Sequence, residues 1–299
     1  MITFLKHGEI DRKKWDHCVM NSKQALVYSL SWYLDLVASG WAGLVEDDYL
    51  SVMAIPVKKK WGHKYIYQPL FTQQLGIYSR ANLSPAKTSE FLKAVPEEIR
   101  YIDYNLNHLH ETENLEFDFT KRVNYELRLN TSYSHLKNSY SANTKRNLQK
   151  TIANIEISES IKIQDIISLK RDNSIRKRKV QYYEWLNCFM DKILTIKKGF
   201  LVGAFYRGEI VGAAFFIFLS GRLYYLIPVS SEVGKSERAM FAILDHVIDK
   251  YADTGLILDF EGSGIPGIAR FFAGFGAKPI NYFNFKLNRL AFPFKLFKR

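Results

Sequence analysis

The sequence predicts an α/β protein that contains two copies of one structural unit. The chain has 299 residues, about twice the ~150 residues of a typical domain. Each half shows the same order of elements: an antiparallel meander, a helix and a further strand. The turn glycines Gly62 and Gly221, and the strand residues Asp103 and Asp259, are each separated by about 160 residues. Such a constant offset indicates an internal repeat.

The first half begins with an amphipathic helix, expected within residues 25–39 and ending before Gly40. Ser84 followed by Pro85 is typical of a helix start and predicts a short helix to about Val95. Alternating apolar residues between turn signals predict five strands. These are residues 42–46, 49–58, 65–71, 100–107 and 123–129.

The second half repeats this order. Glycine-containing turns at residues 207–209 and 220–221 separate three predicted strands of a meander, residues 200–206, 210–219 and 222–228. A helix over residues 237–251 and a strand over residues 256–260 follow. A basic helix over residues 134–153 joins the halves, so we expect two units, 1–133 and 134–299.

The composition is that of a folded protein, with 47% hydrophobic and 24% charged residues, and its net charge of +12 is concentrated. Residues 137–179 hold 11 Lys and Arg against 4 Asp and Glu. Residues 286–299 hold 5 basic residues and no acidic ones. Two basic segments indicate a polyanionic partner, which could be a phosphate-bearing small molecule, RNA or a membrane surface. The alternative is a solvated helix face followed by a basic tail.

Several protein classes find no support in the sequence. The longest apolar run, residues 210–219, is 10 residues long, whereas a membrane-spanning helix needs about 20. The first residues carry charges and no apolar signal region, so we expect a cytoplasmic protein. Cys18 and Cys188 are expected to be buried free thiols. His108 and His110 form the closest histidine pair, which does not match a zinc motif, and we expect no metal.

Three stretches carry a resemblance to a known family. Residues 257–277, ILDFEGSGIPGIARFFAGFGA, resemble the closing segment of the second GNAT unit in FemABX-like proteins. Residues 67–79, YQPLFTQQLGIYS, and residues 140–150, YSANTKRNLQK, are similar to other parts of these proteins. The resemblance covers nearly the whole chain. It implies an α/β (α+β) fold of two tandem GNAT-like units, each with a mixed, mostly antiparallel sheet flanked by helices.

The resemblance also implies a function: transfer of an acyl or aminoacyl group to a cell-envelope or surface-glycan precursor, as in the peptidoglycan aminoacyltransferases. The donor would be an acyl-CoA or an aminoacyl-tRNA. The acceptor would be a phosphate-bearing or lipid-linked substrate, reached with or without peripheral contact with a membrane. The sequence predicts no oligomeric state.

The chain departs from the family pattern at its phosphate loops. The Gln/Arg-x-x-Gly-x-Gly/Ala loop that holds pyrophosphate is incomplete at residues 73–78 and at residues 233–236. Phe271-Phe272 also stand where the aminoacyltransferases often have Phe-Lys. These departures keep a second function open, a non-catalytic GNAT-fold binding protein for a phosphate-bearing ligand.

The candidate catalytic residues are Glu261, Asp259 and Asp103. Asp259 and Glu261 alternate along a predicted strand and should share one face, where a carboxylate of raised pKa could accept a proton from an attacking amine. Asp103 occupies the matching strand of the first half. Gly262 and Ser263 follow and would let the substrate approach the backbone. The alternative is that Asp259 caps a loop while Glu261 pairs with a local cation.

Two groups of residues could bind an anion. One is the start of the last long helix, and the other is one face of the junction helix, with Arg146 as the strongest single candidate because its guanidinium matches phosphate oxygens. The first group comprises Gly234, Lys235, Ser236 and Arg238, and the second comprises Asn143, Lys145, Arg146 and Lys150. The basic run at residues 176–179 is interpreted as a solvated turn or helix end, or as a contact for RNA or anionic lipid.

Overall fold

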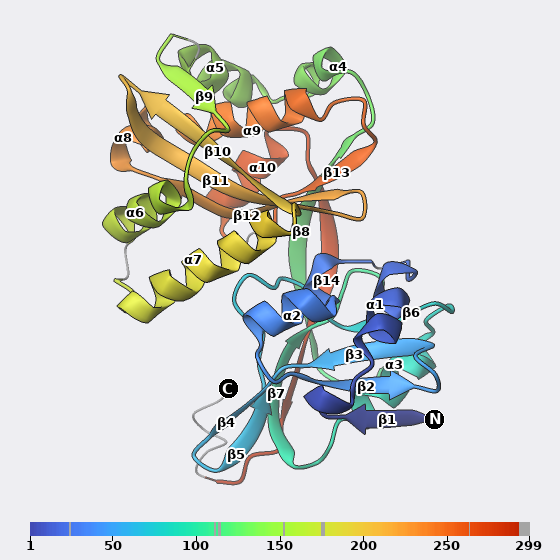
Figure 1. Ribbon diagram of the computed structural model, residues 1–299. Coiled ribbons are helices and arrows are strands. Elements are labelled where there is room, and N and C mark those ends of the chain that lie inside the picture. The colour runs from blue at the N-terminus through green and yellow to red at the C-terminus, as the bar shows by residue number, and fades with distance from the viewer. Residues whose placement is uncertain are drawn as a thin grey trace. The chain divides into compact units, whose positions relative to one another are not determined.

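The computed structural model describes residues 1–23, 25–110, 112, 115–151, 153–174, 177–262 and 264–292, and its chain divides into two compact units (Figure 1). Unit 1 contains Met1–Val123 and the chain from Asn281 onward, and unit 2 is Asn124–Ile280. The strands β8 (Phe119–Leu129) and β14 (Lys278–Asn288) each run from one unit into the other. These units are compact parts of the structure and need not coincide with the two copies of the predicted repeat, so the predicted repeat boundary at residue 133 stays a prediction.

The first sheet of unit 1 is antiparallel, with the strand order β1-β2-β3-β6. Its strands are β1 (Ile2–Leu5), β2 (Ala42–Glu46), β3 (Ser51–Ile55) and β6 (Ile77–Ser79). Two short 3₁₀ helices, η1 (His7–Glu9) and η2 (Val27–Ser29), accompany α1 (Arg12–Met20) and α2 (Ser31–Val37). The Asp11 carboxylate caps α1 by accepting hydrogen bonds from two backbone N–H groups. The buried Trp15 ring of α1 packs so closely on β2 that only a glycine, Gly43, fits beneath it.

The other strands of unit 1 lie in the order β4-β5-β7-β14. The hairpin of β4 (Val57–Lys60) and β5 (His63–Ile66) is antiparallel, and β5 then pairs in parallel with β7 (Ile99–Asn105). The connection between them contains α3 (Pro85–Lys93), which begins as predicted with Ser84 as its N-cap. The expected strand 49–58 is wrong as one element, because it divides into β3 and β4 at Pro56, which has no backbone N–H to donate.

Unit 2 has the strand order β8-β13-β12-β11-β10-β9. Its strands, apart from β8, are β9 (Ile155–Ser158), β10 (Gly199–Tyr206), β11 (Glu209–Leu219), β12 (Arg222–Ser230) and β13 (Leu256–Asp259). Among the described strands of unit 2, β12 and β13 form the one parallel pair, and α8 (Glu232–Ser236) and α9 (Ala239–Lys250) connect them. The predicted meander is confirmed, with turns at Gly208 and Gly221 that have positive φ.

Helices cover both faces of this sheet (Figure 1). Alternate residues of β11 point to opposite faces: Phe216 lies in the core that includes α9, and Phe215 packs against Phe189 of α7 (Val180–Thr195). This two-sided burial explains the unbroken apolar run in β11. The remaining helices of unit 2 are α4 (Tyr133–Asn138), α5 (Ala142–Thr151), α6 (Ile163–Asn173) and α10 (Pro266–Ala273).

Three expected elements differ most in extent from the observed ones. The junction helix 134–153 is two helices, α4 and α5, because Ser139 ends the first and the Ser141 hydroxyl accepts the Thr144 N–H at the start of the second. The expected helix 25–39 is reduced to η2 and α2, and the expected strand 65–71 ends at Ile66. The α/β fold class, with mixed and mostly antiparallel sheets, is confirmed.

Candidate functional site

The strands β12 and β13 of unit 2 form a fork. They pair in parallel only from Arg222 to Tyr224, because β13 ends at Asp259 while β12 continues to Ser230. The fork opens next to a β-bulge, where Tyr225 and Ile227 pair with consecutive residues of β11 and leave Leu226 as the extra residue. A bulge bends its strand and redirects its backbone groups, which accounts for the divergence of β12 from β13.

Aromatic side chains fill the base of the fork. The ring of Phe260 lies 4.8 Å from that of Phe272 and 6.3 Å from that of Tyr225, measured between centroids. All three side chains are buried. Phe272, which the sequence resemblance aligns with a lysine of the aminoacyltransferases, belongs to the core in this chain.

A buried ion network lies at the end of β13. Asp259 has no exposed surface, and its Oδ2 accepts from Arg222 at 3.3 Å. Arg222 also donates to the Glu126 carboxylate at 2.7 Å, so one cation lies between two carboxylates. Asp259 Oδ1 accepts from the Asn124 amide and from the Glu261 backbone N–H, both at 2.9 Å. Sequence analysis missed Asn124, Glu126 and Arg222, because only the pairing of three strands brings them together.

Burial dominates the electrostatics of this network. It raises the pKa of Asp259 to about 6, although Arg222 and the hydrogen bonds to the carboxylate act in the opposite direction. The neighbouring carboxylates in turn raise the pKa of Arg222, which stays charged. Because the Asp259 carboxylate is enclosed and fully bonded, it holds the following loop in place, as the capping alternative described.

Glu261 lies outside the strand, so the expectation that it shares a strand face with Asp259 is wrong. β13 ends at Asp259, and Glu261 and Gly262 have φ values of +62° and +59°. The left-handed backbone at a non-glycine residue is uncommon and turns the chain away from the strand direction. Glu261 is half-buried, and its N–H is the group that Asp259 binds. Ser263 lies outside the described residues.

Asp103 lies in β7 of unit 1, just after the last parallel pair between β5 and β7, Ile66 with Ile102. Asp259 is likewise at the end of the parallel pairing in unit 2, so the two aspartates have equivalent places in their units. The environments differ. Asp103 has a side chain that is 41% exposed, and it accepts from the Asn284 amide at 2.9 Å.

In the loop predicted to bind an anion, residues 234–236, the hydrogen-bond donors are bonded to groups of the same segment. The Gly234 N–H donates to the Ser231 hydroxyl at 3.0 Å, and Lys235 pairs with Glu232 at 2.5 Å. A Cβ on Gly234 would lie 2.1 Å from a carbonyl oxygen of β11, so this glycine is needed for packing of α8 on the sheet. The Ser236 hydroxyl donates to the Val233 carbonyl.

Arg238 begins α9 in a left-handed conformation, with φ of +65°. Its guanidinium donates to the Asn147 side chain at 2.9 Å and to the carbonyl oxygens of Lys235 and Ser236. These bonds tie α9 to α5 and close the turn between α8 and α9. Arg238 is therefore engaged by protein groups, as are the other residues of this loop.

The candidates on α5 are mostly exposed. Arg146 donates to the Asn143 side chain at 3.0 Å, which confirms that the two residues share a face, and Lys145 donates to the Asn138 carbonyl. Lys150 is exposed at the end of the helix. Arg146 is exposed too, so its guanidinium lies at the surface and not in a site shielded from water.

A cavity of about 640 Å³ adjoins the start of α5. Asn143 lines it together with Phe241 from the first turn of α9 and with Arg270 and Phe271 from α10. The ring of Phe271 lies 4.7 Å from that of Phe241 and 5.7 Å from that of Phe272. This cavity therefore has an apolar wall continuous with the aromatic base of the fork, and a polar rim.

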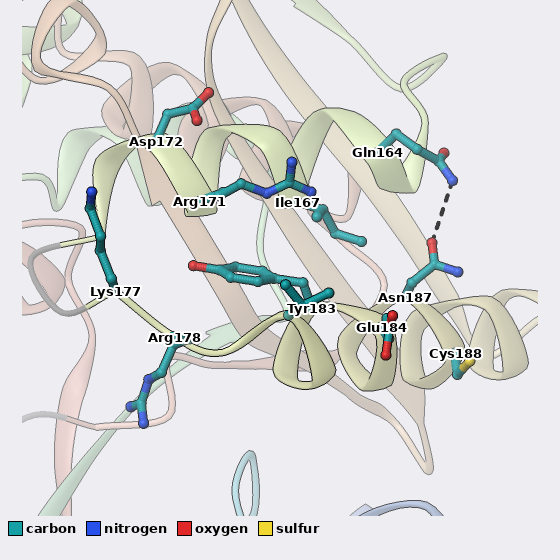
Figure 2. A pocket seen from close by; sticks show the side chains of 11 residues that line it. Gln164, Ile167, Arg171, Asp172, Lys177, Arg178, Tyr183, Glu184, Asn187 and Cys188 are labelled. Atoms are coloured by element: carbon teal, nitrogen blue, oxygen red, sulfur yellow. Dashed lines mark hydrogen bonds between the residues drawn. The ribbon is translucent and has the colours of Figure 1, made fainter.

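A second cavity, of about 1040 Å³, lies between α6 and α7 (Figure 2). Figure 2 shows the guanidinium of Arg171 beside the ring of Tyr183, and the distance from guanidinium to ring centroid is 5.6 Å. Lys177 and Arg178 line the cavity from the segment that enters α7, and in Figure 2 the Arg178 guanidinium points away from Arg171 and Tyr183. These three exposed cations outnumber the two acidic lining residues, Asp172 and Glu184.

The second cavity is the groove between α6 and α7, and part of the basic run at residues 176–179 lines it. Its lining residues also bear on the expected burial of Cys188. Arg178 also lies over the ring of Tyr182, at 5.4 Å, so the run is partly packed on aromatic surface rather than fully solvated. Cys188 lines the groove and is exposed, so the expectation of two buried thiols is wrong for it, whereas Cys18 is buried. The side chains of Arg171 and Tyr183 could have been found from their positions on amphipathic helices next to the run.

The part of the chain that the structure describes contains no group of three His, Cys, Asp or Glu residues close enough to hold a metal ion. His108 and His110 do not form a metal pair. His110 is buried and its Nε2 accepts the Ile77 N–H at 3.0 Å, and burial lowers its pKa to about 3. Within the same described residues, no helix has the length and apolar character needed to cross a bilayer.

The fold of this chain is similar to that of several proteins of known structure. No family model matches the sequence, and no curated protein does. The structure of FemX matches with a TM-score of 0.64 and 12% identity, covering 94% of this chain and 97% of that one. L-PGS from Bacillus licheniformis matches with a TM-score of 0.56 and 10% identity, covering 96% and 94%.

A tandem GNAT protein from the clavulanic acid biosynthesis pathway also matches, with a TM-score of 0.53, 9% identity, and coverage of 97% of this chain and 99% of that one. All three likenesses extend over nearly the full length of both proteins, and at such low identity they establish the fold. Each unit of this chain contains a pair of parallel strands joined by a helical connection, β5 with β7 and β12 with β13, as expected for two copies of one unit. The chain has the FemABX-like tandem GNAT fold.

Proposed function

We propose that the protein is a FemABX-like acyl- or aminoacyltransferase that acts on a phosphate-bearing or lipid-linked precursor of the cell envelope or of a surface glycan. The fork between β12 and β13 carries this proposal. It combines a strand edge released from pairing after Tyr224, a bulge at Leu226 and an adjoining cavity lined by Phe271. The full-length fold likeness to FemX and L-PGS supports the same reaction class.

The fork suits acyl transfer because it offers backbone N–H groups at fixed positions. A donor lying along the released edge of β12 would place its carbonyl oxygen against such groups, which stabilise the charge that develops there. The acceptor amine attacks the carbonyl carbon and forms a C–N bond. The C–S bond of a thioester or the C–O bond of an aminoacyl ester breaks, and the leaving group takes up a proton. The amine loses one proton to a base.

Glu261 is the proposed base. It lies two residues after the end of β13, next to the opening of the fork, and is half-buried. Asp259 is the proposed positioning residue, because its carboxylate has no exposed surface and holds the Glu261 backbone N–H at 2.9 Å. A base role for Asp103 in unit 1 stays a prediction from the sequence.

The test is a transfer assay with the full chain. Acyl-CoA and aminoacyl-tRNA are offered as donors, amine-bearing nucleotide sugars as acceptors, and the product is detected by mass spectrometry. With the active pair, Glu261→Gln should lower turnover by about 10²–10⁴ and leave substrate binding nearly unchanged. Glu209→Gln, an exposed residue in unit 2, is the matched control and should keep full turnover. Turnover of Glu261→Gln at the wild-type rate would contradict the assignment of the base.

A second candidate is a non-catalytic binding protein for a phosphate-bearing ligand. Two observations favour it: the Gly234 loop has its N–H and lysine engaged internally, and the basic side chains gather in the groove of Figure 2. Thermal unfolding separates the candidates, because a ligand at 100 times its Kd stabilises the protein by about 2.7 kcal/mol. Stabilisation by phosphate-bearing acceptors alone, with no transfer from either donor class, would favour the binding protein.

A further inference from the structure

The hairpin of β4 and β5 in unit 1 has a largely exposed tryptophan at its tip. Trp61 is 67% exposed and has φ of +50°, and Gly62 follows with φ of +82°. A two-residue hairpin turn with both φ values positive favours Asn-Gly, because bulky residues are strained in this conformation. Trp61 therefore has an unfavourable backbone conformation although most of its side chain remains exposed to water.

The strands beside this tip are strongly basic. β4 carries the exposed Lys59 and Lys60, and Lys64 on β5 is exposed as well. The Lys60 ammonium lies 4.5 Å from the centre of the Trp61 ring, and Lys64 pairs with Glu98 at 2.8 Å. Lysines on an edge strand commonly prevent sheets from associating, and β4 is such an edge. That role explains the lysines but does not explain an exposed indole among them.

The register of unit 1 brings a second exposed aromatic residue to the same end of these strands. Lys64 pairs with Ile99 at the start of β7, and the Arg289 N–H donates to the Arg100 carbonyl at 2.7 Å. Phe292 follows three residues later and is 80% exposed. We call this set the hairpin surface, and it consists of Lys59, Lys60, Trp61, Lys64, Arg100 and Phe292; its strands can be followed in Figure 1.

We propose that the hairpin surface docks the protein onto an anionic lipid bilayer. Trp61 and Phe292 enter the interfacial layer, where aromatic side chains are favoured, and the lysines and Arg100 face the headgroups. Attraction of basic residues to an anionic leaflet and insertion of a few apolar side chains each give weak membrane binding. Together they give stable binding. The combination of two exposed aromatic side chains with four exposed basic ones matches the surface of an anionic bilayer, where an apolar interface lies beside charged headgroups. The inference goes beyond the proposed function and requires no acyl transfer.

The test is sedimentation of the full chain with vesicles of phosphatidylcholine alone and of phosphatidylcholine with about one third phosphatidylglycerol. Binding is expected only to the anionic vesicles and should weaken as salt is added. Trp61→Asn should lower the partition coefficient about tenfold, since an indole no longer leaves water. Asparagine suits the left-handed turn, so this variant should keep the wild-type melting temperature.

Charge is tested with a matched pair of double variants. Lys59→Gln/Lys60→Gln should weaken binding to the anionic vesicles about fivefold per lysine. Lys192→Gln/Lys197→Gln removes the same charge from exposed positions in unit 2 and should change binding less than about twofold. Vesicles with bromine-labelled acyl chains should quench a component of tryptophan fluorescence that is absent in Trp61→Asn.

Three results would overturn the proposal. The first is no sedimentation with anionic vesicles, or equal sedimentation with neutral ones. The second is equal loss of binding in the two lysine pairs, which would show attraction by net charge without a defined surface. The third is unchanged quenching in Trp61→Asn, which would show that the indole stays in water. Because none of these measurements uses acyl transfer, their failure would leave the proposed function intact.

Discussion

Replacing Arg222 by methionine should destabilise unit 2 strongly. Arg222 has a side chain that is 11% exposed and is the cation between Glu126 and Asp259, at 2.7 and 3.3 Å. Methionine fills much of the space of the arginine stem, so the main change is electrostatic. Removing one partner of a buried ion pair costs about 3–5 kcal/mol, because the remaining charges stay buried without compensation.

The loss should depend on pH with a definite sign. In the wild type, the pKa of Asp259 is about 6, above its unfolded value, so its contribution to stability is fully present at low pH and is lost as pH rises through 6. Arg222 lowers this pKa, and without Arg222 it moves higher still. At pH 5 the carboxyl is protonated in both proteins. Asp259 should therefore add little to the difference between the two proteins at pH 5 and its full share at pH 8, in addition to the loss of the Arg222–Glu126 pair.

Urea unfolding at pH 5 and pH 8, followed by circular dichroism, measures this difference. Arg128→Met is the matched control, since Arg128 is exposed on the same strand as Glu126, and it should cost less than about 0.5 kcal/mol. A loss below about 1 kcal/mol at pH 8, or the same loss at both pH values, would show that the network does not hold the strand end by its charges.

Three further measurements test other parts of the structure. Gly234→Ala places a Cβ 2.1 Å from a carbonyl oxygen of β11 and should cost about 1–3 kcal/mol in thermal unfolding, whereas Gly267→Ala in α10 meets no atom within 4 Å and should cost nothing. Burial lowers the pKa of His110 to about 3, so the free energy of unfolding should fall by up to about 1.4 kcal/mol for each pH unit below about 6.5. A His110→Gln variant should lack this pH dependence, and a variant that keeps it would show that another group causes it. Arg171→Ala should weaken pyrophosphate binding, titrated at fixed salt, more than Arg146→Ala does, and equal effects would remove the groove between α6 and α7 as an anion site.

The fold could largely be predicted where local signals are strong. The meander of β10, β11 and β12 has glycine turns and apolar strands, and α3 has a serine cap followed by proline, so each was readable without tertiary information. α7 was missed although its buried positions follow helical spacing, from Tyr183 through Leu186 to Ile193. The break between α4 and α5 depends on Ser141, whose cap competes with an otherwise continuous helical pattern.

The candidate site was less predictable because its decisive contacts are not local. Asp259 meets Arg222 and Glu126 only through the register of β8, β13 and β12, which no spacing along the chain reveals. The alternation rule failed for Glu261 because it holds only within a strand, and β13 ends two residues earlier. The helical spacing shows which residues share a face with Arg146, but it does not show whether another element covers that face, so the exposure of Arg146 could not be predicted.

The course of β14 has a consequence for how the protein is made. Residues Asn284–Asn288 pair with β7, and the buried Phe285 packs on Phe117, so unit 1 is completed by a strand that follows unit 2 in the sequence. Unit 2 is one continuous stretch, Asn124–Ile280, which leaves the ribosome before that strand. Domains usually fold in the order of their synthesis. Here unit 1 cannot complete this sheet before unit 2 has been synthesised, so we expect the edge of β7 to stay unpaired until residues 284–288 have left the ribosome.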